Sequence, residues 1–277
     1  MAIRGSTSGL DALARQPMDR RHSLRWLGAT ALGTVSPLGL IACGGGEADD
    51  SGSATDGGSC GVIPTETAGP YPADATMASG LRLNALSLQG IVRRDIRTSV
   101  GDADGTALGV PLTVVLTLVD AGASCQPLSG RAVYLWHCTR DGSYSLYSGG
   151  HTQENYLRGV QVSDSSGQVR FETVFPGCYS GRWPHIHFEV YDSLADALDT
   201  GSAGDYRKVS QLALPATACD EVYAEAAGYA ASVAQFNRVS LSSDNVFGDD
   251  RASRQLASVT GSVGLGFEAR LTVGLDG

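Results

Sequence analysis

Short apolar stretches of strand length recur along the chain, each bounded by Gly, Asp or Pro. They cover residues 88–92, 112–119, 132–138, 169–175, 185–191 and 265–273. Residues 112–119 are rich in β-branched side chains, which is typical of a buried strand. Only residues 217–236 have the Ala-rich composition of a helix. Several short strands separated by turn signals predict an all-β sandwich or barrel with one or two short helices.

The N-terminal region carries the pattern of an export signal. Arg20 and Arg21 precede an uncharged apolar stretch, residues 26–42, which is too short for a confident membrane span. The Arg pair resembles a twin-arginine signal, and residues 40–43 resemble a lipoprotein cleavage box that ends at Cys43. We therefore expect a signal peptide at 1–42 and a lipid anchor on Cys43, although an ordinary secretory peptide with an incidental Cys also fits.

The expected organisation is then a flexible, Gly- and Ser-rich linker at 43–59 and one folded domain at 60–277. The protein would be exported from a bacterial cytoplasm, as a membrane-anchored lipoprotein or as a periplasmic or extracellular protein. The 277 residues have a formal net charge of −9, so nothing in the composition provides a basic footprint for nucleic acid.

The most informative segment, residues 176–190, places two histidines on a strand. Since side chains alternate along a strand, His185 and His187 should share one face while Ile186 and Phe188 pack on the other. Two imidazoles at this spacing can grip one metal ion, but such a pair is also common by chance. Arg182 is a cation beside them, which suits a site where negative charge develops, or it simply pairs with Glu189 or an acidic loop.

Two further segments carry candidate chemistry. Residues 133–147 read as a strand with Trp136, then a turn at Gly142, then Tyr144. Residues 65–72 open the domain and contain Tyr71 in a Gly-Pro-Tyr sequence.

Taken in chain order, the three segments resemble the intradiol ring-cleavage dioxygenases, the non-haem iron(III) enzymes that open catechols. The spacing Arg-x-Pro-His-Ile-His after Pro-Gly-x-Tyr, with Trp-x-x-x-x-x-Gly-x-Tyr upstream, carries this resemblance over roughly residues 65–273. The overall form is most similar to the protocatechuate 3,4-dioxygenase-like, exported single-domain branch. The resemblance implies a β-sandwich of that type, an Fe(III) cofactor, and cleavage of a catechol-type ring between its two hydroxyl-bearing carbons with O2.

The resemblance also assigns roles to residues. The iron ligands would be Tyr144, Tyr179, His185 and His187, with Tyr179 as the catalytic tyrosinate that leaves when substrate binds. Arg182 would be the catalytic, substrate-binding arginine, and Tyr71 would bind substrate at the mouth of the pocket. Phenolate oxygen is a hard donor, which suits iron(III) better than zinc.

The expected partners are a small aromatic diol and O2, with no nucleic acid and with membrane contact only through Cys43. The family often assembles from paired β-domains, so a homo-oligomer is allowed. The sequence does not indicate which catechol is the substrate.

Some alternatives stay open at this stage. Tyr147 could replace Tyr144 as a ligand, Tyr71 could be mere packing, and His151 reads as a solvated surface residue. Arg158 and Gln161 could support the iron site from behind or be ordinary loop polarity. The whole domain could also be a non-catalytic β-sandwich binding module, or could hold zinc or copper on its two strand histidines.

Five cysteines lie beyond Cys43, and an exported domain permits disulfides. Five is odd, so at least one should be free unless it pairs between chains. Cys138 and Cys178 flank the expected site and are the first choice for a pair.

Overall fold

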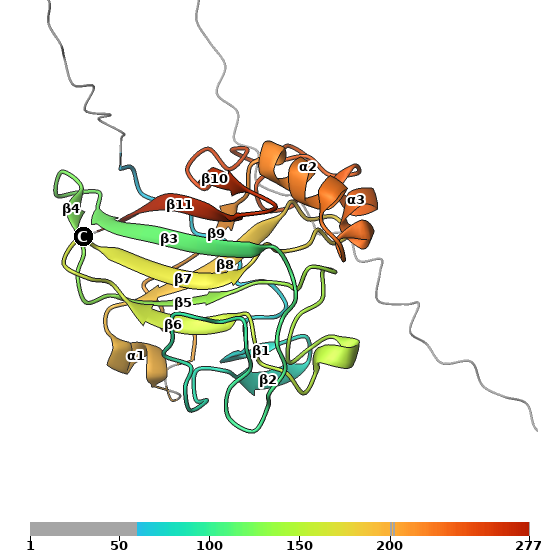
Figure 1. Cartoon of the computed structure of the whole chain (residues 1–277). Coiled ribbons are helices and arrows are strands. Elements are labelled where there is room, and N and C mark those ends of the chain that lie inside the picture. Colours follow the sequence, from blue (N-terminus) through green and yellow to red (C-terminus); the bar gives the residue numbers. More distant parts are fainter. Residues whose placement is uncertain (1–59, 200, 202, 277) are drawn as a thin grey trace, which may run out of the picture. The chain divides into compact units, whose positions relative to one another are not determined.

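A computed structural model describes residues 60–199, 201 and 203–276 (Figure 1). These residues fall within one compact unit that spans Asp56–Gly277. The expected signal peptide, Cys43 and the linker at 43–59 lie outside the described residues. Within the described part, no helix is long and apolar enough to cross a membrane.

One layer of the sandwich is a five-stranded sheet with the order β10-β11-β3-β4, in which β7 also pairs with β3. Its long central strand β3 runs parallel to β11 and antiparallel to β7. The strands are β3 (Pro111–Asp120), β4 (Gln126–Pro127), β7 (Gln168–Val174), β10 (Ser258–Ser262) and β11 (Gly266–Leu275).

The second layer is a four-stranded antiparallel sheet with the order β6-β5-β8-β9. Its strands are β5 (Ala132–Trp136), β6 (Arg158–Val162), β8 (His185–Tyr191) and β9 (Lys208–Ala213). Figure 1 shows the two sheets stacked on one another, with the small β1-β2 hairpin and α1 beyond the β5-β6 side of the second sheet.

The remaining elements are short. The hairpin consists of β1 (Asp74–Ala78) and β2 (Leu81–Asn84), and a 3-10 turn, η1, covers Gly149–His151. The helices are α1 (Leu194–Leu198), α2 (Ala216–Glu225) and α3 (Ala230–Phe236). The prediction of an all-β sandwich is therefore confirmed, and the described residues contain three short α-helices where one or two were expected.

The core lies between the sheets and follows from strand alternation. Val114 and Leu116 of β3 and Ile186 and Phe188 of β8 are 0% exposed and belong to one hydrophobic cluster. Both faces of β8 are buried, because its other face packs under a second cluster around Trp136. The histidines on that second face are thus held on a strand that is covered on both sides.

Two predicted elements differ from the structure. Residues 88–92 do not form a strand, because Gly90 has φ +89° in a turn and only Val92 makes an isolated bridge, to Val160. The stretch of helical composition at 217–236 is not continuous: it forms two helices, α2 and α3, separated by Gly228 with φ +91°. In both places a glycine in the left-handed region interrupts a run of suitable composition.

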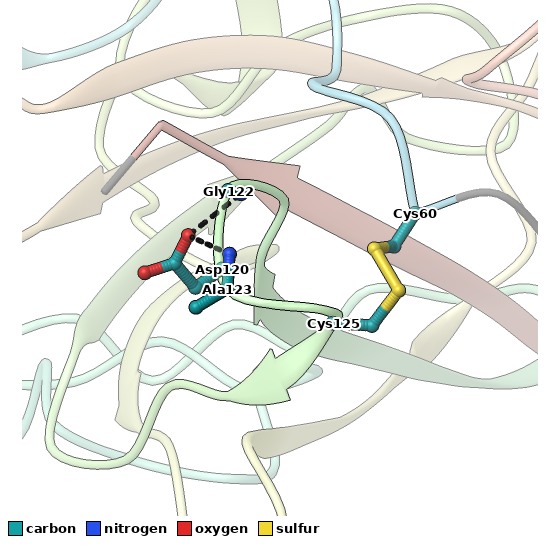
Figure 2. The surroundings of a disulfide bond; sticks show 5 residues. All are labelled: Cys60, Asp120, Gly122, Ala123 and Cys125. Carbon is teal, nitrogen blue, oxygen red and sulfur yellow. Dashed lines mark hydrogen bonds between the residues drawn. A yellow bond between two sulfur atoms is a disulfide. The ribbon is translucent and has the colours of Figure 1, made fainter.

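The disulfide joins Cys60 to Cys125, across 65 residues of sequence (Figure 2). Cys125 follows a turn in which the Asp120 carboxylate accepts the backbone N–H groups of Gly122 and Ala123. The predicted Cys138–Cys178 pair is wrong: both thiols are free and buried, as is Cys219.

The free thiols have partners of their own. Cys138 Sγ donates to the carbonyl of Gly177, and Cys178 Sγ donates to the carbonyl of Arg182. Burial raises the pKa of Cys178 to about 12, which keeps this thiol protonated and unreactive. The expectation that at least one cysteine is free is confirmed.

From the disulfide, residues 60–72 run as a strap toward the second sheet. Ile63 N–H donates to the carbonyl of Gly274 at 2.9 Å, and Glu66 N–H donates to that of Val209 at 3.0 Å. The strap ends beside His187, where a Cβ on Gly69 would lie 3.2 Å from the imidazole Cε1. Gly69 has φ +73°, so both its conformation and the close approach call for glycine.

Candidate metal centre

His185 and His187 project from the same face of β8, as alternation predicts. Their Nε2 atoms are 3.0 Å apart, and each residue is 2% exposed. The Trp136 ring stacks on His187 with centroids 5.0 Å apart and planes 6° apart, and the Nδ1 of His187 is buried without a partner. The pair is therefore aimed at one point by the strand and by the packing around it.

The imidazole of His185 has a defined tautomer. Its Nδ1 lies within hydrogen-bonding distance of the carbonyl of Trp183, which can only accept, so Nδ1 carries the proton. The lone pair on Nε2 consequently points toward His187. An imidazole whose far nitrogen donates to a carbonyl is the usual arrangement of a metal-bound histidine.

Two tyrosines bring phenol oxygens to the same point. The hydroxyl oxygens of Tyr144 and Tyr179 are 3.2 Å apart, and that of Tyr179 is 3.0 Å from Nε2 of His185. Tyr144 follows the turn at Gly142, where φ is +86° and a Cβ would lie 3.1 Å from Cβ of Tyr179. The turn thus lets the two tyrosine-bearing segments pack closely.

Of the two tyrosines after that turn, Tyr144 is the one in the cluster. Tyr147 points elsewhere, since its hydroxyl accepts the backbone N–H of Ala73 at 3.0 Å. Tyr144 is 1% exposed, whereas Tyr179 is partly exposed. The two phenols therefore differ in their exposure to solvent.

Burial keeps all four groups uncharged in the absence of a cation. It lowers the pKa of His185 to about 3 and the pKa of His187 well below its ordinary value. It also raises the pKa of Tyr144 and of Tyr179 well above the usual value. Two neutral imidazoles are good metal ligands, and phenols in such a place ionise only next to a strong Lewis acid.

The donor set fits iron(III). Among the described residues, no three of His, Cys, Asp and Glu gather in a way that could hold a metal ion. Here two nitrogen donors are combined with two phenol oxygens, which become hard anionic ligands when they ionise. The metal-ligand roles of Tyr144, Tyr179, His185 and His187 thus stay proposals that the geometry suits.

Arg182 borders this cluster. Its Nη1 lies 3.4 Å from Nε2 of His185, its Nη2 donates to Oε1 of Gln211 at 2.6 Å, and its Nε donates to Asp244 at 2.9 Å. Its partner is therefore an acidic loop residue. Glu189, the other candidate, accepts a hydrogen bond from the Tyr191 hydroxyl instead.

Gln211 and Asp244 are not among the residues singled out from the sequence. Gln211 lies on β9, and its Nε2 donates to the carbonyl of Thr67 in the strap at 2.9 Å. Asp244 is 3% exposed in the segment after α3. Neither stands in a motif, and nothing in the sequence distinguishes Asp244 from nearby acids such as Asp249.

Tyr71 lies at the edge of the cluster and is partly exposed. Its ring centroid is 4.7 Å from that of Tyr144 and 5.2 Å from that of Tyr147. Tyr71 therefore packs against both tyrosines, and its substrate-binding role stays a prediction.

Arg158, the first residue of β6, is 0% exposed, and its guanidinium carbon lies 5.6 Å from the centre of the Tyr147 ring. Its guanidinium donates to the backbone carbonyls of Tyr71, Pro72 and Ser145 at 2.8 to 3.0 Å. It therefore ties the end of the strap to the loop that carries Tyr144. Gln161 is half-buried, and its amide donates to the neighbouring Val160 carbonyl.

The two other histidines of the described residues lie outside the cluster. His137 is buried between the Thr173 hydroxyl and the Cys138 carbonyl. His151 is partly exposed on η1 beside the Tyr156 hydroxyl, so it is less solvated than the sequence suggested.

One protein-family model matches this chain. The family model described as Dioxygenase matches residues 93–195, a span that includes Tyr144, Tyr179, Arg182, His185 and His187. Among curated proteins, no sequence matches this chain.

Solved structures define the fold. An intradiol ring-cleavage dioxygenase from Tetranychus urticae is 23% identical with a TM-score of 0.56, over 78% of this chain and 95% of that one. The dioxygenase domain of a dioxygenase and carbohydrate-binding protein fusion from Streptomyces sp. SirexAA-E is 22% identical, over 78% of this chain and 99% of that one, with a TM-score of 0.47.

The resemblance indicated by the sequence motifs is confirmed: the chain has the β-sandwich of the intradiol ring-cleavage dioxygenases. Since a shared fold does not establish an activity, the reaction is a separate question.

Proposed function

We propose that this protein is a non-haem iron(III) dioxygenase that cleaves a catechol-type ring between its two hydroxyl-bearing carbons with O2. The proposal depends mainly on one observation: two phenol oxygens and two imidazole nitrogens lie together. The Tyr144 and Tyr179 hydroxyl oxygens are 3.2 Å apart, and Nε2 of His185 is 3.0 Å from both the Tyr179 hydroxyl and Nε2 of His187. Arg182 borders this cluster. The fold shared with an intradiol ring-cleavage dioxygenase supports the same proposal.

The four donor residues have distinct tasks in this proposal. Bound iron(III) would act as a Lewis acid that holds the two catechol oxygens and makes the ring reactive toward O2. His185 and His187 supply neutral nitrogens on a rigid strand. Tyr144 is buried and stays in place, whereas the more exposed Tyr179 is the ligand free to swing away and take a substrate proton.

Arg182 and Tyr71 act on the substrate. Arg182 keeps Nη1 directed at the cluster while its other nitrogens are engaged, so a fixed positive charge faces the position of the bound diol. Negative charge that develops on the opening ring is stabilised by such a preorganised donor. Tyr71 offers an aromatic face at the edge of the site.

The test is to load the purified protein with iron(III) and measure both colour and O2 uptake with catechol, protocatechuate and hydroxyquinol. We expect a visible tyrosinate-to-iron band that Tyr144→Phe and Tyr179→Phe each shift or remove. The matched control Tyr147→Phe should leave the band unchanged, because that hydroxyl lies outside the cluster.

Arg182→Ala should still bind iron, while turnover falls on the order of 100-fold or more. A colourless protein with full zinc occupancy and no O2 uptake would contradict the proposal. That result would favour a non-catalytic binding module or a zinc or copper site on the two histidines.

We also propose that the protein is exported and anchored by a lipid on Cys43. The support is the sequence alone: Arg20 and Arg21, the apolar stretch 26–42 and the cleavage box. Wild-type protein should partition into the membrane fraction and Cys43→Ser into the soluble one. Equal partitioning of the two would contradict the anchor.

A further inference from the structure

Asp244 lies in the segment between α3 and β10, outside residues 93–195 that match the dioxygenase family model. Its side chain is fully buried, and that of its partner Arg182 is 12% exposed. A buried carboxylate must have its oxygens satisfied, so the identity of its partners shows what it is used for.

The two carboxylate oxygens have separate partners. Oδ1 accepts the backbone N–H groups of Val246 and Phe247, at 2.8 and 2.9 Å, and so closes its own loop. Oδ2 accepts Nε of Arg182 at 2.9 Å and the backbone N–H of Trp183 at 2.6 Å. One oxygen therefore shapes the loop, while the other holds the arginine and the residue that follows it.

This arrangement fixes the direction of the guanidinium. With Nε held by Asp244 and Nη2 held by Gln211, the planar group has no free rotation, and Nη1 is left facing His185. The Phe247 ring lies 5.8 Å from the guanidinium carbon and limits movement on that side. A guanidinium clamped at two of its three nitrogens presents the third in one orientation.

We propose that Asp244 is the positioning residue of the catalytic arginine: its Oδ2 aims Nη1 of Arg182 at the metal centre, independently of its Oδ1, which caps the loop. This inference rests on the proposed function, because it assigns Asp244 a part in the reaction of Arg182. It places a residue of the C-terminal segment in the site, although that segment lies outside the family-model match.

Because the two carboxylate oxygens of Asp244 have separate partners, a substitution can change one set of contacts and keep the other. Asp244→Asn keeps one oxygen for Val246 and Phe247 but puts an NH2 group, which cannot accept, opposite Nε of Arg182 and N–H of Trp183. Asp244→Ser is the second variant, since its hydroxyl is shorter and can accept as well as donate, so no donor is forced against the guanidinium. The matched control is Asp250→Asn, because Asp250 caps the same segment through Ala252 and Ser253.

We expect both Asp244 variants to bind iron with wild-type stoichiometry and colour, while kcat/KM for catechol falls on the order of 10- to 100-fold. The control should stay within about twofold of wild type, because the hydrogen bonds of Asp250 stay within its own loop and do not reach Arg182. In a double-mutant cycle, Asp244→Asn added to Arg182→Met should cost less than about twofold further, because the aspartate acts only through the arginine.

A second readout does not depend on turnover. Arg182 in the iron-free protein should react several-fold faster with phenylglyoxal in Asp244→Asn than in wild type, as read by peptide mass spectrometry. Unchanged labelling, wild-type kcat/KM in Asp244→Asn, or full additivity with Arg182→Met would each overturn the inference. A wild-type protein with no turnover would instead refute the proposed function, and the labelling would still decide whether Asp244 positions Arg182.

Discussion

Breaking the Cys60–Cys125 disulfide should remove about 4 kcal/mol from the free energy of unfolding. The perturbation is Cys60→Ser together with Cys125→Ser, or reduction of the wild-type protein. The bond closes a loop of 65 residues, and loop-closure entropy for that length gives about 4 kcal/mol at 25 °C. Since a domain has roughly 5–15 kcal/mol in total, the loss would be a large share of it.

The assay is urea unfolding at fixed pH, followed by fluorescence and circular dichroism, with and without reductant. The urea dependence should steepen as well, because an unfolded chain without the cross-link exposes more surface. The double variant with reductant is the control: Cys138, Cys178 and Cys219 are already free, so reductant should not affect it further.

Two results would refute this reasoning. One is a change of less than about 1 kcal/mol on reduction, which would mean that the cross-link does not restrict the unfolded chain as the loop length requires. The other is equal destabilisation of wild type and double variant by reductant, which would place the effect elsewhere.

Other predictions concern the support of the metal centre and its pH dependence. Arg158→Met should cost about 3 kcal/mol in urea unfolding, because the carbonyls of Tyr71 and Ser145 lose their donor and that of Pro72 keeps only the Tyr134 hydroxyl. A cost below about 1 kcal/mol would contradict this. Gly69→Ala should lower iron affinity in metal titrations, because the new Cβ would press on His187 and the backbone conformation disfavours alanine. An unchanged iron affinity would contradict this and show that the strap moves away without cost. Burial lowers the pKa of His137 from its ordinary value of 6.5 to about 4. Protonation of His137 therefore favours the unfolded chain, and the iron-free protein loses stability as the pH falls from 6.5 to 4, with no such effect above pH 6.5. For one proton, the free energy of unfolding changes by about 1.4 kcal/mol per pH unit in this range. His137→Gln should reduce the pH dependence of the free energy of unfolding by that amount, and an unchanged pH dependence would contradict this.

The parts of the site that could be predicted from sequence are those set by local backbone geometry. Strand alternation alone puts His185 and His187 on one face, and β8 spans the expected residues. The turn at Gly142 brings Tyr144 in and leaves Tyr147 out, in agreement with the motif register. These features depend on residues that are close in the sequence, so the local sequence pattern is enough to predict them.

The parts that could not be predicted depend on which distant segments meet. The Cys60–Cys125 bond joins a strap to a turn 65 residues away, whereas the pair chosen for its closeness to the site turned out to be two free thiols. Asp244 reaches Arg182 from 62 residues away and looks like any other loop acid in the sequence. Contacts of this kind follow from the tertiary fold, which composition and periodicity do not specify.

The measurement that tests the central claim most directly is the isotope content of the product. Iron-loaded protein is given catechol and 18O2, and the product is analysed by mass spectrometry. Cleavage between the hydroxyl-bearing carbons predicts a ring-opened dicarboxylic acid with two 18O atoms, one in each new carboxyl group. A semialdehyde from cleavage outside the two hydroxyls, a simple quinone, or unchanged catechol would contradict the account.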